Sequence, residues 1–167
     1  MGADDLIANG HDVAILNHHS GDIYQNAASS GRISYLGISG FPTAFFDGTT
    51  SVVGGGSTSM YSQYLSRYNQ KIAVPSSFSK DIQGSSSGLI DFDVNVTINK
   101  VDAAYAGTDV RLHCAITETN IPHSWGGLSH VNNVNRMMLP SHNGTPLDFS
   151  AGNIIEQNYS FTLDPSW

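Results

Sequence analysis

Apolar and polar residues alternate strictly along residues 89–99. Every second position is apolar, and the positions between them are Asp, Asn or Thr. The apolar positions are Ile90, Phe92, Val94, Val96 and Ile98. Because successive side chains of a strand point to opposite faces, this pattern predicts an antiparallel strand with one buried and one solvated face.

Three further segments in the second half of the chain have the character of strands. Residues 110–117 repeat the alternation, with Cys114 on the apolar side. Residues 155–163 suggest another strand, and so do residues 131–139, although Asn132 and Asn133 interrupt the period there. Turn sequences separate these segments at residues 84–88, 106–107, 126–127 and 143–144. Short strands at this spacing predict an antiparallel β-sandwich over residues 75–167.

The first 74 residues have a different pattern, in which helical and strand-like segments alternate. The clearest helix has apolar residues at three- and four-residue spacings: Met60, Tyr61, Tyr64, Leu65, Tyr68 and Ile72. This apolar stripe predicts an amphipathic helix that Ser57 or Thr58 caps and that ends before Pro75. Residues 3–9 resemble the end of a helix closed by Gly10. Residues 11–17 predict a short apolar strand, and residues 22–38 contain a weaker helix.

Residues 40–53 predict a hairpin. Asp47-Gly48 supplies the two positive-φ positions of a type I′ turn, and the second strand would cover residues 49–53. The X-Pro bond of Phe41-Pro42 stands in a tight turn before a core strand, where a cis isomer is expected. Thr43 begins the first strand.

Composition narrows the classes of function. The formal charge is −7, and only 13% of the residues are charged, so no basic stripe is available for nucleic acid. A single cysteine, Cys114, excludes an internal disulfide and a cysteine-based metal site, and we expect it to be buried. No run of about 18 apolar residues exists to span a membrane.

Histidines are the remaining candidates for metal ligands. His18-His19 with Asp22 would form at most a loose site, because adjacent strand residues point to opposite faces. His123, His130 and His142 have no spacing typical of zinc ligands, and we expect separate surface positions. The sequence contains none of the common motifs of hydrolases, phosphate-binding loops or metalloproteases. We therefore expect no metal, no cofactor and no catalytic constellation within this chain.

Two features carry a resemblance to a known family. The segment Gly40-Phe41-Pro42-Thr43 and its hairpin resemble the cis-proline loop of the thioredoxin fold. The β-rich half carries His130-Val131-Asn132-Asn133-Val134-Asn135-Arg136-Met137-Met138-Leu139-Pro140, followed by Gly144-Thr145-Pro146-Leu147. Together they are similar to the Omp-twenty-eight-related outer-membrane lipoproteins of Bacteroidetes-type bacteria. The resemblance implies an α+β chain with a truncated thioredoxin-like α/β subdomain, residues 1–74, and a β-sandwich, residues 75–167.

The resemblance also implies a location and a function. The expected function is non-catalytic binding of a protein or peptide at the bacterial outer membrane or cell surface, with membrane attachment only through a lipid anchor outside this sequence. In the thioredoxin fold the backbone at Phe41, beside Pro42 and Thr43, pairs with extended peptide. Arg136 is expected to have a structural role, paired with Glu118 or Asp148. Asp47 and Gly48 are also expected to be structural, because they form the hairpin turn.

One alternative remains open. Many members of the family carry a Cys-X-X-Cys site, which this sequence lacks, so the chain is either redox-inactive or part of a thiol-disulfide oxidoreductase whose cysteines lie upstream. If the first strand of the fold is missing, residues 13–16 would lie beside an open slot. We expect this slot to be covered, either by self-association or by the β-sandwich folding back over it.

Overall fold

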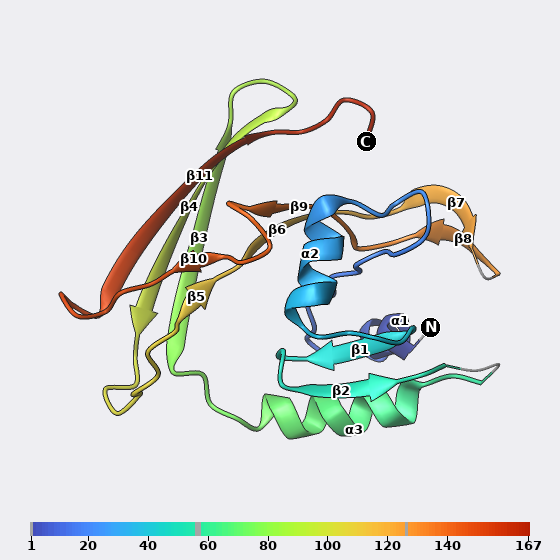
Figure 1. Cartoon of the computed structure of the whole chain (residues 1–167), viewed down its shortest axis with the longest axis horizontal. Helices are drawn as coiled ribbons and strands as arrows, with labels where there is room; N and C mark the ends of the chain where they lie inside the picture. The colour runs from blue at the N-terminus through green and yellow to red at the C-terminus, as the bar shows by residue number, and fades with distance from the viewer. Residues whose placement is uncertain (1, 56–57, 126) are drawn as a thin grey trace.

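The computed structural model describes residues 2–55, 58–125 and 127–167. These residues form a mixed α+β structure with three helices and eleven strands in antiparallel sheets (Figure 1). The helices are α1 (Gly2–Ala8), α2 (Ala27–Tyr35) and α3 (Tyr61–Ile72). The strands are β1 (Thr43–Phe46), β2 (Thr50–Val53), β3 (Phe78–Ser86), β4 (Asp91–Lys100), β5 (Arg111–Leu112), β6 (Cys114–Glu118), β7 (Ile121–Trp125), β8 (Leu128–Val131), β9 (Val134–Leu139), β10 (Thr145–Pro146) and β11 (Ile154–Thr162).

The longest sheet has the strand order β11-β4-β3, with β4 at its centre. The antiparallel register of β4 with β11 runs from Asp91↔Thr162 to Asn99↔Ile154. The alternation predicted for this segment is confirmed, because Val96 and Ile98 are buried whereas Asp91 and Asp93 are exposed. The strand at residues 155–163 is confirmed as β11.

A second layer covers the apolar face of this sheet. Val96, Ile98, Leu147 and Tyr159 form the buried cluster, and half-buried side chains pack against it from Val110, Leu112, Cys114 and Leu139. The predicted strand at 110–117 is divided at His113, since β5 pairs with β10 whereas β6 pairs with β9. Cys114 is half-buried against this core, and burial raises the pKa of its thiol.

Two strand predictions in this half need correction. The segment predicted at 131–139 is strand β9 only from Val134 on, whereas Val131 ends β8, because Asn133 has a positive φ of 57° and breaks the run. Strand β3, which was not predicted, is an edge strand that is exposed along nearly its whole length and so has no apolar alternation. The β7–β8 hairpin was also missed. Gly126, part of the predicted turn between β7 and β8, lies outside the described residues.

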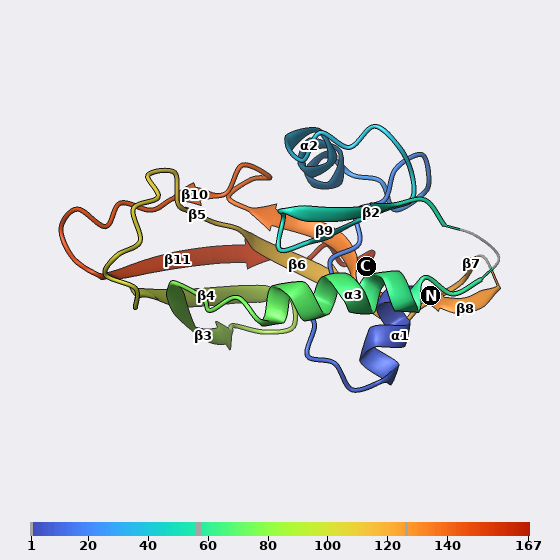
Figure 2. The same ribbon diagram turned by 90° about the horizontal axis from the view of Figure 1, so that it is seen from below.

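The first 74 residues build a smaller layered arrangement around the β1–β2 hairpin. Figures 1 and 2 place α2 and α3 on opposite sides of the hairpin, with α1 beside α3. The predicted helix that ends before Pro75 is confirmed as α3. The predicted cap Thr58 is wrong, because Met60 stands at the N-cap position and no side chain caps the helix from there. Tyr61 N instead donates to Ser59 Oγ at 3.1 Å, and Ser57, the other predicted cap, lies outside the described residues.

The other two helices follow their local sequence signals. Asn26 caps α2, since its Oδ1 accepts from Ser29 N at 2.8 Å. Gly10 has a φ of +78° after α1, and Gly37 has a φ of +65° after α2, so each glycine stops a helix in the left-handed region.

The strand predicted at residues 11–17 is wrong. Only Asn17 makes a bridge, a parallel one to Val134 of β9. Asn17 N donates to Asn133 O at 2.8 Å, and Asn135 N donates to Asn17 O at 2.9 Å. The segment therefore pairs at its end with the second half of the chain, because no strand of the first half lies alongside it among the described residues.

Candidate functional site

The cis-proline loop opens the β1–β2 hairpin. The Phe41-Pro42 peptide bond is cis, as predicted. Thr43 Oγ1 donates to Gly40 O at 2.7 Å, and Pro42 O accepts from Gly54 N at 2.8 Å. These two bonds fix both sides of the loop, while the Phe41 side chain remains 59% exposed.

The hairpin turn has the geometry that Asp47-Gly48 predicts. Asp47 and Gly48 have φ values of 49° and 64°, and Thr49 N donates to Phe46 O at 3.1 Å. Two successive positive φ values with this closing bond are typical of a type I′ turn. Strand β2 begins at Thr50, one residue later than predicted.

The outer edge of β1 carries backbone groups that face away from β2. Pro42 O and Phe46 O both point toward the partner strand, as their hydrogen bonds show. Because backbone groups alternate along an antiparallel strand, those of Thr43 and Phe45 point outward. In the part of the chain that the structure describes, β1 pairs with β2 alone. We call Thr43 and Phe45, together with Phe41 just before the strand, the outer edge of β1.

Packing against α3 holds this hairpin in place. The Phe46 ring meets the Tyr64 ring edge to face at a centroid distance of 5.5 Å, and Val52 of β2 is buried. Burial raises the pKa of the Tyr64 hydroxyl. Phe46 thus anchors one face of β1, and the odd-numbered residues of the outer edge lie on the other face.

The outer edge of β1 offers binding contacts rather than reactive side chains. Residues 40–46 contain only Gly, Phe, Pro, Thr and Ala, so no group there titrates or acts as a general base. The single thiol, that of Cys114, belongs to β6 in the other half of the chain. Hydrogen bonds to an extended backbone are the interaction that such an edge offers.

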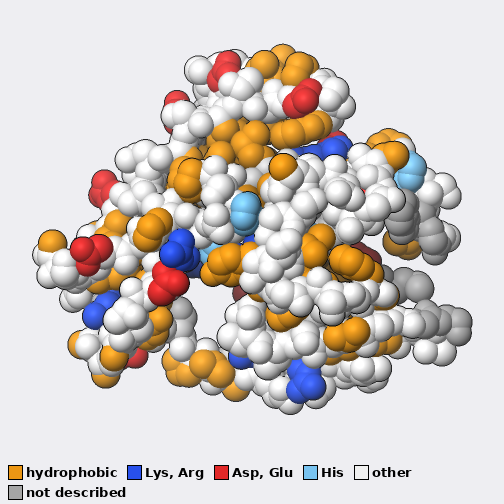
Figure 3. Space-filling model, in the orientation of Figure 1, with side chains coloured by type: hydrophobic (Ala, Val, Ile, Leu, Met, Phe, Trp, Pro, Cys, Tyr) orange, Lys and Arg blue, Asp and Glu red, His pale blue; other side chains and the backbone are white. Residues whose placement is uncertain are grey.

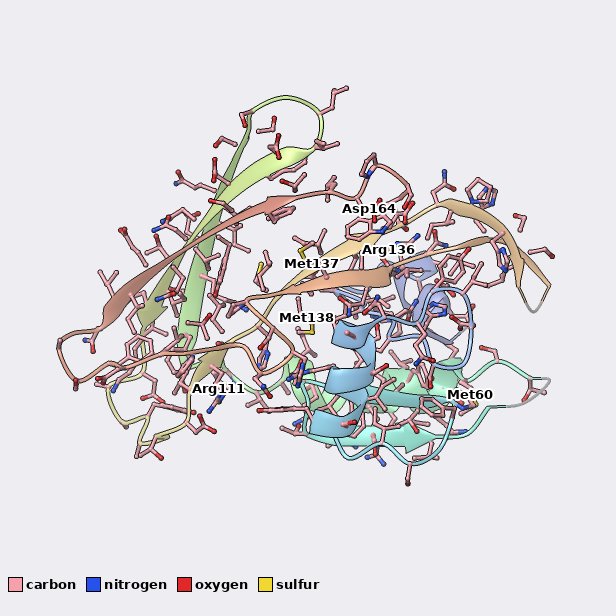
Figure 4. The ribbon with its side chains drawn as sticks, turned by 45° about the horizontal axis from the view of Figure 1, so that its top comes forward. Met60, Arg111, Arg136, Met137, Met138 and Asp164 are labelled. Atoms are coloured by element: carbon pink, nitrogen blue, oxygen red, sulfur yellow. The ribbon has the colours of Figure 1, made fainter. Side chains whose placement is uncertain are left out.

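Arg136 on β9 has the structural environment that was predicted. Its guanidinium binds Glu118 Oε2 through Nε at 2.6 Å and through Nη2 at 2.5 Å, which confirms the first of the two expected partners. The same group lies over the rings of Tyr24 and Trp167, at 5.3 and 5.7 Å from their centroids. Figure 4 shows Arg136 beside Asp164, near the end of the chain. The other expected partner, Asp148, instead accepts from Ser150 N at 2.9 Å.

The histidines have different polar partners, although the rings of His19 and His123 both pack against Tyr24. His19 Nδ1 lies 2.8 Å from Asp22 Oδ2, whereas His18 Nδ1 lies 3.3 Å from Asn135 Nδ2. The ring of His123 packs edge-on against Tyr24, and that of His142 lies against Gly31. Within the described ranges, no three His, Cys, Asp or Glu side chains are grouped so that they could hold a metal ion.

A buried polar junction joins the two halves of the chain, and the sequence gives little sign of it. We define the junction as Asn17, Asn26, Ser29 and Asn135. Ser29 and Asn135 are fully buried, and Asn135 Nδ2 donates to Ser29 Oγ at 3.3 Å. Asn26 Nδ2 donates to Asn135 O at 2.6 Å. Asn and Ser are ordinary surface residues in this chain, so only the apolar neighbours of Asn135 on β9 could have indicated its burial.

Comparisons with known proteins add no relative. No family model, no curated protein and no solved structure matches the chain. In the described residues, no helix has the length and apolar character needed to cross a membrane.

Proposed function

We propose that this chain is a non-catalytic, peptide-binding part of a bacterial cell-envelope lipoprotein. In this proposal, a partial thioredoxin-like subdomain over residues 1–74 precedes a β-sandwich over residues 75–167, and a lipid anchor outside this sequence provides membrane attachment. The motif around Arg136 and the cis-proline loop support the family and the location. The two-layer packing of the β strands supports the sandwich.

One observation carries the binding function: the outer edge of β1 presents outward backbone groups next to an exposed phenylalanine. An extended peptide would add to this edge as a further strand, with main-chain hydrogen bonds for affinity and side-chain contacts for selectivity. Phe41, Pro42 and Thr43 would form the start of this edge. The absence of charge along residues 40–46 favours an uncharged, apolar peptide segment over an acidic or basic one.

A proline substitution on each edge of the hairpin tests this proposal. Phe45→Pro removes an outward N–H from β1, whereas Ser51→Pro removes the matching outward N–H from β2, because Phe45 and Ser51 are register partners. A display library of random ten-residue peptides would be selected against the unmodified protein. We expect Phe45→Pro to weaken binding of the selected peptides about tenfold or more, since it removes a hydrogen bond and blocks the strand edge.

A milder variant tests the same edge without the risk that a proline unfolds the hairpin. Phe41→Ala removes the 59% exposed ring without altering the backbone pattern, and it should also weaken binding. Ser51→Pro should bind as the unmodified protein does. If no peptide is enriched, or if the enriched peptides bind equally well to Phe45→Pro and Phe41→Ala, the outer edge of β1 is not the binding site.

The alternative is part of a thiol-disulfide oxidoreductase whose Cys-X-X-Cys lies upstream of this sequence, and it is supported by the resemblance of Gly40-Phe41-Pro42-Thr43 and its hairpin to the cis-proline loop of the thioredoxin fold. Reduction of insulin by the full-length natural protein would support it. Lack of any insulin reduction would leave peptide binding without redox chemistry as the function.

A further inference from the structure

Two arginines from different elements hold one loop. This loop, residues 141–144, connects β9 to β10. Arg32 of α2 donates through Nη1 to His142 O at 3.4 Å, and Arg111 of β5 donates through Nη1 to Asn143 O at 3.3 Å. Since these carbonyl groups are adjacent in the chain, the two guanidinium groups converge on the same short segment.

His113 completes the group. Arg32 Nη1 lies 3.4 Å from Nδ1 and 3.3 Å from Nε2 of its imidazole, so the guanidinium stands over the ring rather than in its plane. The guanidinium also lies over the Tyr35 ring at 4.5 Å. Stacking on two rings orients the planar fork of Arg32.

Two glycines let the imidazoles come close to the backbone. A Cβ at Gly144 would lie 2.7 Å from His113 Nδ1, and a Cβ at Gly31 would overlap the ring of His142. Both rings are thus seated in positions that only a glycine permits. The four residues Arg32, Arg111, His113 and His142 form what we call the arginine–histidine cluster.

The charges of this cluster are not balanced. Arg111 has an ion pair with Asp109 at 2.7 Å. The contacts of Arg32 are two rings and a carbonyl group, and among the described residues no carboxylate pairs with it. The chain has only seven Lys and Arg residues, and on the face shown in Figure 3 their side chains are scattered. A half-buried guanidinium without a counter-charge is unfavourable unless an anion approaches it.

We propose that the arginine–histidine cluster binds a small oxyanion of the carboxylate or phosphate type. The fork of Arg32 supplies paired donors for two oxygens, and Arg111, although ion-paired with Asp109, adds further N–H donors across His113. The arginine–histidine cluster shares no residue with the outer edge of β1, so the two proposed sites are independent. Figure 4 shows Arg111 well apart from Arg136, so the latter belongs to a different set of contacts.

His113 reports on such binding. Burial first, and then the charges of Arg32 and Arg111, lower the pKa of its imidazole. The charged or titratable groups that face it are Arg32 and Tyr35 from α2 and Arg111 from β5, with His142 in the adjoining loop. A bound oxyanion offsets the positive charges, so it raises the pKa of His113. By linkage, the oxyanion then binds more tightly as the pH falls.

Histidine NMR titrations with inorganic phosphate and with acetate test the proposal, with sodium chloride at matched ionic strength as the reference. We expect a rise in the pKa of His113 with at least one of the two oxyanions and none with chloride. A response to phosphate alone indicates a phosphate-type ligand, and a response to acetate alone indicates a carboxylate. If neither oxyanion moves the pKa of His113 beyond the chloride reference, the proposal is wrong.

Two arginine variants give a matched comparison. Arg32→Gln should weaken oxyanion binding about tenfold or more, because it removes a charge-assisted interaction. Arg67→Gln, on α3, removes an arginine that donates to Gln70 Oε1 and lies outside the cluster, and it should leave binding unchanged. Equal weakening in both variants would mean a general effect of net charge and would overturn the assignment. Arg32→Lys keeps the charge without the fork, and it provides a second measurement if Arg32→Gln does not fold.

Discussion

The two halves of the chain bury their residues in different ways. In residues 75–167, β4 is paired along nearly its full length on both sides, and its apolar face meets a second layer of strands. In the described part of residues 1–74, the only sheet is the β1–β2 hairpin, with four register pairs and an open outer edge. The first arrangement contains its own core, whereas the second has few buried side chains.

The buried residues of the first half show where its stability comes from. They include Leu6 and Val52 within the half itself, and Tyr24 and Ser29, which are buried against the other half. Tyr24 packs with Val131 and Val134, and Ser29 belongs to the junction with Asn135. A region with so small a core of its own depends on its neighbour for order, and this neighbour has a core that does not depend on it.

The largest expected effect is on the core of the long sheet. Ile98 is 2% exposed, so Ile98→Ala should lower the free energy of unfolding by about 2 to 5 kcal/mol, through lost burial and a residual cavity. Because the first half is ordered against this half, both should unfold together. Chemical denaturation followed by tryptophan fluorescence and circular dichroism measures the change.

An exposed isoleucine of the same sheet is the control for this prediction. Ile82 on β3 is 67% exposed, and Ile82→Ala should change the free energy of unfolding by no more than about 0.5 kcal/mol. Similar losses for Ile98→Ala and Ile82→Ala would contradict the idea that the core lies between the two layers.

The junction gives the second prediction, which separates the two halves. Asn135→Ala removes the bonds from Nδ2 to Ser29 Oγ and toward His18 Nδ1 and leaves a buried hydroxyl without this partner. Asn135 Oδ1 has no partner among the described atoms, so its removal offsets part of the cost. We expect a loss of about 1 to 2 kcal/mol, confined mainly to the first half.

Hydrogen exchange measures where this loss falls. The amides of α2 should lose protection in Asn135→Ala, while those of β4 keep it. Asn95→Ala is the control, because Asn95 makes an exposed bond to Asn158 across the long sheet at 2.9 Å. Equal loss of protection in α2 and β4 would show that the two halves form one cooperative unit.

The same contrast explains what the sequence could predict. Alternation is a local signal, so β4 and β11 were predicted correctly from it, and the periodic helix α3 and the Asp47-Gly48 turn were predicted from equally local rules. Strand β3 was missed because an exposed edge strand needs no apolar residues. The strand at residues 11–17 was predicted from its apolar composition, but a strand also needs a neighbouring strand to pair with. In this segment only Asn17 forms such a pair, a bridge to Val134.

The candidate sites divide in the same way. The cis bond at Phe41-Pro42 and the Arg136–Glu118 pair were predicted from residues close to each motif or from the few charges available. The arginine–histidine cluster and the junction join residues about 80 to 110 positions apart, and nothing in their local sequence shows that they meet. Sites formed by contacts between the two halves could be found only from the fold.

The smallest predicted effect is a pH dependence at the junction. Burial, followed by the charges of Arg32 and His19, lowers the pKa of His18 to about 4, from an ordinary value of 6.5. The unfolded chain therefore binds more protons than the folded chain between pH 6.5 and pH 4. Consequently the contribution of His18 to stability is fully present above pH 6.5, and it is lost as the pH falls toward 4. Because the ring is only partly buried, solvent screening limits this contribution to less than about 1 kcal/mol. His113 acts in the same direction, since its pKa is also lowered.

Hydrogen exchange between pH 6.5 and pH 4, corrected for the intrinsic exchange rate, should show α2 losing protection before β4. In His18→Gln this difference should shrink, whereas His130→Gln, a substitution on β8 outside the junction, should leave it unchanged. If His18→Gln and the unmodified protein lose protection in α2 equally as the pH falls, the junction is not the acid-sensitive contact between the two halves.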